Sequence, residues 1–204
     1  MIESPIGYKI HVIGNSCSGK STLGAHLATL LDVPCVDLDA LNWEPDWAGL
    51  NHADPPELER RIAAATAGDG WIVAGSYASF MQKVCWQRLD TVVWLDLPLR
   101  VLLWRFLDRS WRRWWSKELL WGTNYESFWG HLMVWRKEES LLWWIVTQYR
   151  PKRQRMLNYY TDPQWKHIRF LRLCSVAEVE KFTKAIEQLC IAGDSQKAGQ
   201  KSTQ

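Results

Sequence analysis

The chain has 204 residues, of which 47% are hydrophobic and 23% are charged, and its formal net charge at pH 7 is +3. This length is enough for one domain with a substantial core, and the small net charge does not call for a nucleic-acid partner. The five cysteines are scattered and form no CxxC pair, which argues against a disulfide framework and a zinc site and predicts a reducing compartment, the cytoplasm.

Short apolar segments alternate along the chain with longer segments of helical periodicity. The apolar segments predict five strands, at residues 8–14, 33–40, 70–76, 91–98 and 167–175. The periodic segments predict helices at residues 19–31, 55–68, 98–116, 126–158 and 175–189. Residues 117–126 are expected to be irregular, and the polar segment 192–204 is expected to be a disordered tail. Strands that alternate with helices predict βαβ units and a mainly parallel sheet.

Neither a signal peptide nor a transmembrane helix is expected. The N-terminal segment lacks a basic region followed by a long apolar stretch. Arg and Lys interrupt every apolar block after residue 98, so no apolar run reaches the roughly 18 residues that a membrane span needs.

The most informative motif is VIGNSCSGKST at residues 12–22, which contains the full Walker A pattern G-x-x-x-x-G-K-S between a predicted strand and a predicted helix. Its glycines let successive backbone amides point at phosphate oxygens, and the helix N-terminus adds a positive dipole end. Lys20 is expected to reach the β- and γ-phosphates, and the Ser21 hydroxyl to bind Mg²⁺. The residues expected to bind the nucleotide are Gly14, Asn15, Ser16, Cys17, Ser18, Gly19, Lys20, Ser21 and Thr22.

The rest of the sequence narrows the reaction class. A GTPase would carry an NKxD-type segment that recognises guanine, and the chain has none. A motor or AAA-type ATPase would be longer, with a fuller Walker B segment. Phosphate transfer from ATP to a small acceptor fits a chain of this length better.

Three acids lie where predicted strands end, which is where parallel α/β sheets bind ligands. Asp37 and Asp39 are two residues apart and would share one face of a strand. They are candidates for binding an acceptor hydroxyl, taking its proton or holding Mg²⁺, and the alternative is that they cap the following helix or face solvent. Asp96 ends VVWLD in a Walker B arrangement and is a candidate Mg²⁺ ligand, although a helix N-cap role fits equally well.

The predicted helix after Pro98 is rich in arginine. Arg105, Arg109 and Arg112 follow i, i+4, i+7 spacing and line one face. Arginines of a closing lid supply the positive charge that phosphoryl transfer needs. The alternatives are a solvated basic face, or a helix that lies in a membrane surface, since tryptophans are interleaved with the arginines.

The second half of the chain holds most of the 15 tryptophans. Those of the long predicted helix, Trp129, Trp135, Trp143 and Trp144, are expected to be mainly core. The basic run YRPKRQR at residues 149–155 is expected to be a solvated helix end, and contact with phosphate or nucleic acid is the alternative.

At this point the chain resembles the small P-loop kinases related to adenylate kinase, a family also described as AAA family ATPases or DNA topology modulation proteins. The resemblance covers about residues 8–185 and includes GNSCSGKSTL, LDALNWEPDW, WIVAGSY, DTVVWLDLPLRVLLWR, ELLWGTNYESF and RFLRLCSVAEVEKF. LDALNWEPDW and ELLWGTNYESF are narrower signals than the P-loop, which is specific only to the superfamily.

The resemblance implies a P-loop NTPase of the α/β class, with a nucleotide-kinase-like three-layer α/β/α fold, a five-stranded parallel sheet and a helical lid. It implies a kinase domain over residues 1–191 with the lid and acceptor region at about 105–130. It implies ATP and Mg²⁺ as ligands, Asp37 and Asp39 at the acceptor or metal, and lid arginines at Arg105 and Arg109, with Arg112 and Arg113 next in line.

One segment departs from the family pattern. Relatives have sequences like VIDGNY where this chain has IVAGSY, so Ala74 stands where an acid would support Mg²⁺ and Ser76 where Asn is common. Either Asp96 or the Asp37/Asp39 pair then takes over the metal, or turnover is weak.

The leading hypothesis is an ATP-dependent kinase of a small hydroxyl- or phosphate-bearing acceptor, with a nucleoside or nucleotide among the candidates. The rival is an ATP-binding regulator or ATPase with weak catalysis, which could contact nucleic acid. A membrane-surface protein is a third, weaker hypothesis.

Overall fold

The computed structural model describes residues 6–116, 119–120, 124–125 and 141–201. Its centre is a five-stranded sheet in the order β2-β3-β1-β4-β7, and every neighbouring pair in it is parallel. The strands are β1 (Lys9–Gly14), β2 (Cys35–Asp37), β3 (Trp71–Ala74), β4 (Thr91–Leu95) and β7 (Arg169–Leu173). The five predicted strands and their parallel pairing are therefore confirmed.

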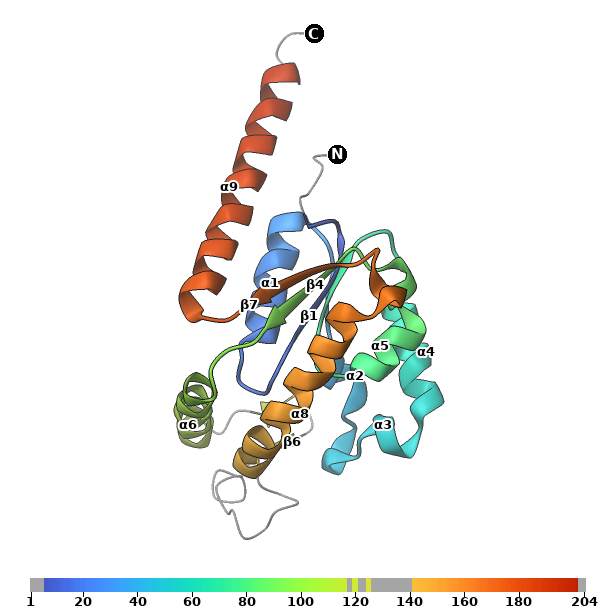
Figure 1. Ribbon diagram of the computed structural model, residues 1–204, viewed down its shortest axis with the longest axis vertical. Helices are drawn as coiled ribbons and strands as arrows, with labels where there is room; N and C mark the ends of the chain where they lie inside the picture. The colour runs from blue at the N-terminus through green and yellow to red at the C-terminus, as the bar shows by residue number, and fades with distance from the viewer. Residues whose placement is uncertain (1–5, 117–118, 121–123, 126–140, 202–204) are drawn as a thin grey trace.

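Helices cover both faces of the sheet, so the fold has the expected three layers (Figure 1). One face packs against α1 (Lys20–Leu31) and α9 (Val176–Lys201). The other face packs against α4 (Pro55–Ala65), α5 (Ala78–Val84) and α8 (Leu141–Thr161). α6 (Leu99–Ser116) lies beside α8. Short elements complete this part of the fold: α2 (Leu38–Asn42), η1 (Pro45–Trp47), α3 (Leu50–Ala53), η2 (Trp86–Arg88) and η3 (Pro163–Trp165).

The core follows the pleat of the strands. Ile10 and Val12 of β1 face α1 and α9, whereas Ile13 belongs to the cluster on the opposite side. Because both faces are covered, β1, β3 and β4 are almost continuously apolar. Trp71 and Trp86 are fully buried in the same cluster as Ile13.

Two predicted segments differ from the structure. The predicted strand at 33–40 ends at Asp37, whose side chain accepts a hydrogen bond from the Asp39 amide and so begins α2. Residues 117–126 were expected to be irregular, yet β5 (Leu119–Leu120) and β6 (Asn124–Tyr125) pair as an antiparallel hairpin.

The last two helices also differ from the prediction. α8 continues through Pro151 to Thr161, and the part of the predicted helix at 126–140 lies outside the described residues. α9 begins at the expected capping box, where the Glu178 amide donates to the Ser175 hydroxyl at 3.1 Å. It then runs to Lys201 instead of ending near 189, so its backbone is helical over most of the segment expected to be disordered.

The long helix does not bury its tryptophans as expected. Trp143 and Trp144 are 37% and 48% exposed, and Trp129 and Trp135 lie outside the described residues. Within the described part of the chain, no helix combines the length and the apolar character that a bilayer span requires.

Candidate active site

The phosphate loop leaves the central strand β1 and enters α1, as the motif predicts. At Gly14, a Cβ atom would lie 2.7 Å from the Ser18 hydroxyl and 2.8 Å from the Leu95 carbonyl, so no side chain fits. Gly19 has φ +93°, a backbone conformation that favours glycine. Both motif glycines are therefore required by the shape of the loop.

Lys20 turns back over this loop. Its Nζ donates a hydrogen bond of 3.0 Å to the Asn15 carbonyl. The pKa of Lys20 is below its ordinary value, mainly because the ammonium is buried and also because Arg109 is near; Asp39, Cys17 and Asp37 oppose this shift. A bound anion would compensate for that burial, which is the function expected of a phosphate-loop lysine.

Two side chains outside the helix brace the loop. The Ser76 hydroxyl, just after β3, donates to the Gly14 carbonyl at 2.7 Å. The Asn15 side chain donates to the Ile145 carbonyl of α8 at 3.2 Å and accepts from the Ser16 amide at 2.8 Å. The start of the loop is thus tied to β3 and to α8.

A buried histidine supports the segment that carries Ser76. His11 of β1 lies within hydrogen-bond distance, 3.2 Å, of the Gly75 carbonyl through Nε2, and its Nδ1 faces the Trp86 indole nitrogen at 3.2 Å. Since an indole N–H only donates, Nδ1 must be the acceptor and Nε2 must carry the proton. Burial lowers the pKa of His11 to about 4, so the ring is neutral at pH 7.

Ser21 and Asp37 meet at one edge of the loop. The Ser21 hydroxyl donates to Asp37 Oδ2 at 3.2 Å. Asp37 lies opposite Ala74 in the β2–β3 register, so it stands beside the position where relatives have an acid. Burial, and then the neighbouring Asp39, raise the pKa of Asp37. A hydroxyl and a carboxylate together form an oxygen donor set of the kind that suits Mg²⁺.

Asp39 lies on α2, in its first turn. Its Oδ1 accepts a hydrogen bond of 3.0 Å from the Tyr77 hydroxyl. The expectation that Asp37 and Asp39 share one face of a strand was wrong, because the chain turns into a helix between them. The two carboxylates therefore have different partners, Ser21 and Tyr77.

Asp96 is engaged elsewhere. Its side chain is 5% exposed, and its Oδ2 accepts from Arg172 Nε at 2.9 Å and from Arg153 Nε at 3.1 Å. Arg172 also stacks on the Trp94 ring at 4.8 Å. Asp96 thus links β4 to β7 and α8.

The arginines of α6 separate into two groups. Arg105 Nη1 donates to the Ser18 carbonyl in the phosphate loop at 2.8 Å, and Arg109 lies close enough to Lys20 to lower its pKa. Arg112 instead pairs with Asp108 on the exposed side, and the Arg113 side chain lies outside the described residues. The structure therefore brings Arg105 and Arg109, but not Arg112, to the loop.

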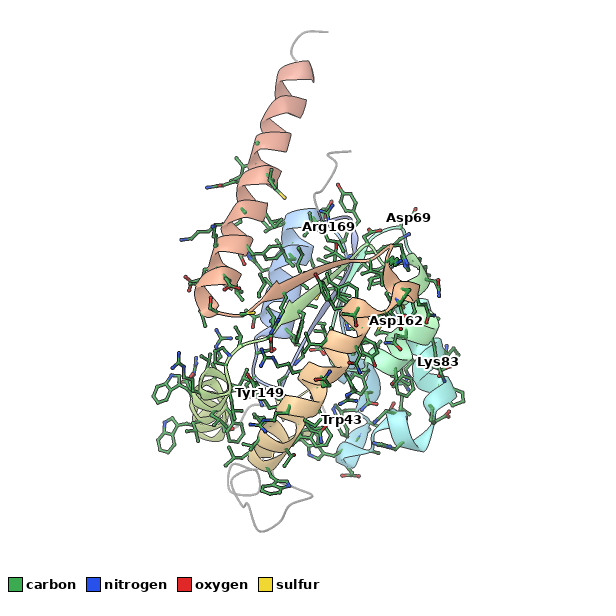
Figure 2. All side chains as sticks on the ribbon, viewed as in Figure 1. Trp43, Asp69, Lys83, Tyr149, Asp162 and Arg169 are labelled. Carbon is green, nitrogen blue, oxygen red and sulfur yellow. The ribbon has the colours of Figure 1, made fainter. Side chains whose placement is uncertain are left out.

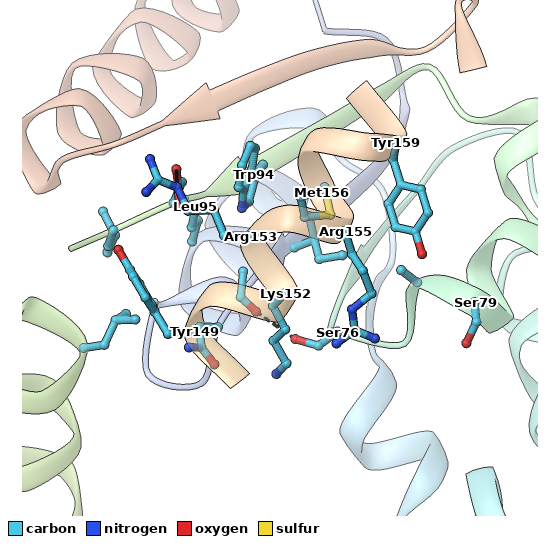
Figure 3. A pocket seen from close by; sticks show the side chains of 17 residues that line it. Ser76, Ser79, Trp94, Leu95, Tyr149, Lys152, Arg153, Arg155, Met156 and Tyr159 are labelled. Atoms are coloured by element: carbon cyan, nitrogen blue, oxygen red, sulfur yellow. Dashed lines mark hydrogen bonds and ion pairs between the residues drawn. The ribbon is translucent and has the colours of Figure 1, made fainter. Parts of the chain in front are cut away.

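A cavity of about 90 Å³ adjoins the loop, between α8 and the carboxyl ends of β1 and β4 (Figure 3). Lys152, Arg153 and Arg155 of α8 line it. Arg150, Arg153 and Arg155 are exposed, as expected of a solvated helix end, whereas Lys152 is half-buried. Figure 2 shows Tyr149, another lining residue, and Trp43 in the lower part of the view, below Asp69 and Arg169, which lie near the amino ends of β3 and β7.

The two narrow sequence signals meet near this end. Strand β6, from the segment ELLWGTNYESF, lies against η1, from the segment LDALNWEPDW. Trp43 and Trp47 of the second segment pack edge to face, with ring centroids 5.7 Å apart.

Comparison with known sequences gives partial matches. No family model matches the chain. The uncharacterized protein YqaC of Bacillus subtilis (strain 168) is 29% identical over 118 residues, 57% of this chain and 65% of YqaC. A shikimate kinase of Synechococcus sp. (strain JA-3-3Ab) is 33% identical over 114 residues, 51% of this chain and 60% of the kinase. The matches therefore span less than two thirds of either relative.

Comparison with solved structures covers nearly the whole chain. A gluconokinase from Sinorhizobium meliloti 1021 aligns with 96% of this chain and 98% of its own, with a TM-score of 0.52 and 15% identity. The chain has the fold of the P-loop kinases. This P-loop kinase fold confirms the expected fold class.

Four residues near the loop of this P-loop kinase fold were not singled out as site residues. Ser76 and Tyr77 follow β3, and their position after a buried strand was the available signal. Lys152 and Arg155 lie in the basic run of α8. Their position depends on how α8 packs against the sheet, which sequence spacing does not encode.

Proposed function

We propose that the protein is an ATP-dependent phosphotransferase that acts on a small hydroxyl-bearing acceptor. The observation that carries the proposal is the Ser21–Asp37 pair beside a complete Walker A loop, with Asp39 next to it. Phosphoryl transfer needs a nucleotide site, a magnesium site and a carboxylate that faces the acceptor, all in one place. The P-loop kinase fold supports the same activity.

The loop amides and Lys20 would hold the β- and γ-phosphates, and Ser21 and Asp37 would hold Mg²⁺. When bound, Mg²⁺ supplies positive charge that offsets the charge of the phosphates. We assign the metal to this pair in preference to Asp96, because two arginines already pair with Oδ2 of Asp96 and balance its charge. Arg105 and Arg109 add positive charge at the loop.

Asp39 is our candidate for the group that binds the acceptor hydroxyl and takes its proton. The acceptor oxygen forms a bond to the terminal phosphorus, the bond to the bridging oxygen breaks, and ADP leaves. Tyr77 donates to one oxygen of Asp39 and leaves the other for the acceptor. The likeness to a shikimate kinase in sequence and to a gluconokinase in fold favours a small hydroxylated metabolite as the acceptor class.

The rival function, an ATP-binding regulator with weak catalysis, rests on Ala74. Asp37 lies beside Ala74 in the sheet and reaches Ser21, so an acid is still available at the metal position. This arrangement favours the kinase. A cytoplasmic location is part of the proposal, and all five cysteines are free thiols.

The direct test incubates the protein with labelled ATP, Mg²⁺ and a metabolite mixture and identifies any phosphorylated product by mass spectrometry. Lys20→Ala is expected to abolish product and weaken ATP binding at least about tenfold, because a charge-assisted contact to phosphate is lost. Lys166→Ala, at an exposed lysine, is the matched control. ATP affinity and turnover unaffected by Lys20→Ala would disprove the nucleotide site, and tight ATP binding without any product would favour the regulator.

A further inference from the structure

The cavity beside the phosphate loop carries an excess of positive charge. Its lining includes the cations Lys152 and Arg155, the hydroxyls of Ser76, Ser79, Tyr149 and Tyr159, and one acid, Asp96. Arg153 also lines it, but its charge is balanced by the ion pair with Asp96. Figure 3 shows the side chains of Lys152 and Arg155 extending from α8 toward Ser76.

In the part of the chain that the structure describes, neither of these two cations is paired with an acid. Among the residues that the structure describes, no carboxylate lies within ion-pair distance of Lys152 or Arg155; the Lys152 ammonium lies over the Trp144 ring at 5.5 Å. Burial lowers the pKa of Lys152 to about 7, and repulsion from Lys20 and Arg155 adds to this, while Asp39 opposes it. A bound anion would reduce the repulsion between two such neighbouring cations, so its binding at this place is favourable.

Lys152 lines the cavity and is also close enough to Lys20 and Asp39 to feel their charges. The charges that act on it come from Lys20 of the phosphate loop, Asp39 of α2 and Arg155 of its own helix. A small molecule whose hydroxyl meets Asp39 would therefore place its far end near the two cations of α8.

We infer that Lys152 and Arg155 bind a carboxylate or phosphate group of the acceptor, which makes the acceptor a small hydroxy acid or a hydroxyl-bearing phosphate ester. This inference rests on the proposed kinase function, because it assigns the cavity to the acceptor. Arg155 offers a planar fork of N–H donors and Lys152 a point charge, a combination that matches either anion. A neutral polyol of the same shape would leave both cations without an anion, so the site selects for charge.

Protection of Lys152 from acylation tests the anion site without knowledge of the acceptor. The protein is saturated with AMP-PNP and Mg²⁺ so that the phosphate loop is filled, and trace labelling with acetic anhydride at pH 7.5 is read by mass spectrometry. Inorganic phosphate and formate serve as separate probes for the two anion classes. A bound anion that raises the pKa of Lys152 by about one unit lowers its neutral fraction, and hence its labelling, about threefold, while exposed Lys166 is unchanged.

Two variants make this result specific. Arg155→Gln is expected to remove the protection, because half of the anion site is lost. Arg150→Gln, an exposed arginine on the same helix, is expected to retain it. Absence of protection by both probes, or protection that survives Arg155→Gln, would overturn the inference.

Matched pairs of compounds test selection for charge on the same AMP-PNP complex. Binding is measured by calorimetry for glycerate against glycerol, glucose 6-phosphate against glucose, and AMP against adenosine. The charged member of at least one pair is expected to bind at least tenfold more tightly, and Lys152→Met is expected to remove that preference. Equal binding within every pair would contradict the inference.

A separate AMP-PNP titration distinguishes the two proposals. If AMP-PNP fails to bind, the proposed function fails. If AMP-PNP binds normally but no anion protects Lys152, only the acceptor assignment fails. A loss of AMP-PNP affinity in Lys152→Met would assign the cavity to the nucleotide and likewise overturn the inference.

Discussion

Ser21, in the first turn of α1, donates a hydrogen bond of 3.2 Å to Asp37 at the end of β2. This contact joins the helix that follows the phosphate loop to the carboxyl end of β2. The contact depends on the sheet order. Strand β3 lies between β2 and β1, and in this order the end of β2 brings Asp37 within hydrogen-bond distance of Ser21.

Asp37→Asn should weaken the dependence of ATP binding on Mg²⁺. The amide keeps the size of the side chain but removes the negative charge that favours a divalent cation. We expect the gain in ATP affinity on adding Mg²⁺ to fall about tenfold or more, measured by titration with and without EDTA. Asp32→Asn is the control, since Asp32 is exposed and Asn tolerates its left-handed backbone. A metal response equal to that of the native protein would remove Asp37 from the metal site.

Asp96→Asn should destabilise the fold and leave the Mg²⁺ response intact. The change leaves Arg153 and Arg172 without the carboxylate that holds α8 and β7 to β4. Because both arginines are partly exposed, we expect about 2 kcal/mol in urea unfolding, below the about 3–5 kcal/mol of a fully buried pair. Asp108→Asn, which breaks an exposed pair, should have little effect. A selective loss of the Mg²⁺ response would instead restore Asp96 as a metal ligand.

Tyr77→Phe should slow turnover more than it weakens ATP binding. Tyr77 acts through Asp39, whose Oδ1 accepts its hydroxyl proton, so it is a positioning residue. We expect kcat to fall about tenfold with little change in the KM for ATP, because the hydrogen bond that orients the Asp39 carboxylate is lost. Tyr160→Phe, at a residue 60% exposed, is the control. Parallel losses of kcat, ATP affinity and thermal stability would indicate a structural role only.

The free energy of unfolding should fall as the pH is lowered, because His11 is buried in its neutral form. Its pKa is 6.5 in the unfolded reference and about 4 when buried, so between these values the unfolded chain binds a proton that the folded protein does not. Stability is therefore lost as the pH falls through this window, by up to about 3 kcal/mol at about 1.4 kcal/mol per unit. Urea unfolding at pH 7 and pH 4.5 measures the loss.

His11→Gln provides the comparison, because Gln can still donate to the Gly75 carbonyl and accept from the Trp86 indole without titrating. The loss between pH 7 and pH 4.5 should be smaller in this variant, while exposed His52→Gln should behave like the native protein. Equal losses in all three proteins would exclude His11 as the source.

The sequence alone determined the phosphate loop and the parallel sheet. The loop is local: two glycines, a lysine and a serine at fixed spacing require one backbone shape, and Gly14 and Gly19 have it. The strands are recognisable because burial on both faces makes them continuously apolar. The same logic placed Arg105 and Arg109 on one face of a helix, and that face meets the loop.

Tertiary structure alone decided which strand-end acid serves which purpose. Asp37 and Asp96 both end apolar strands, and nothing local distinguishes them. Asp96 is neutralised by Arg172, which is 76 residues away in sequence and adjacent only because β7 pairs with β4. Asp37 stays next to Ser21, and Lys152 is half-buried at a cavity because α8 packs against the sheet. Charge pairing across such distances depends on packing, and packing is set by the whole core rather than by the spacing of residues in any one segment.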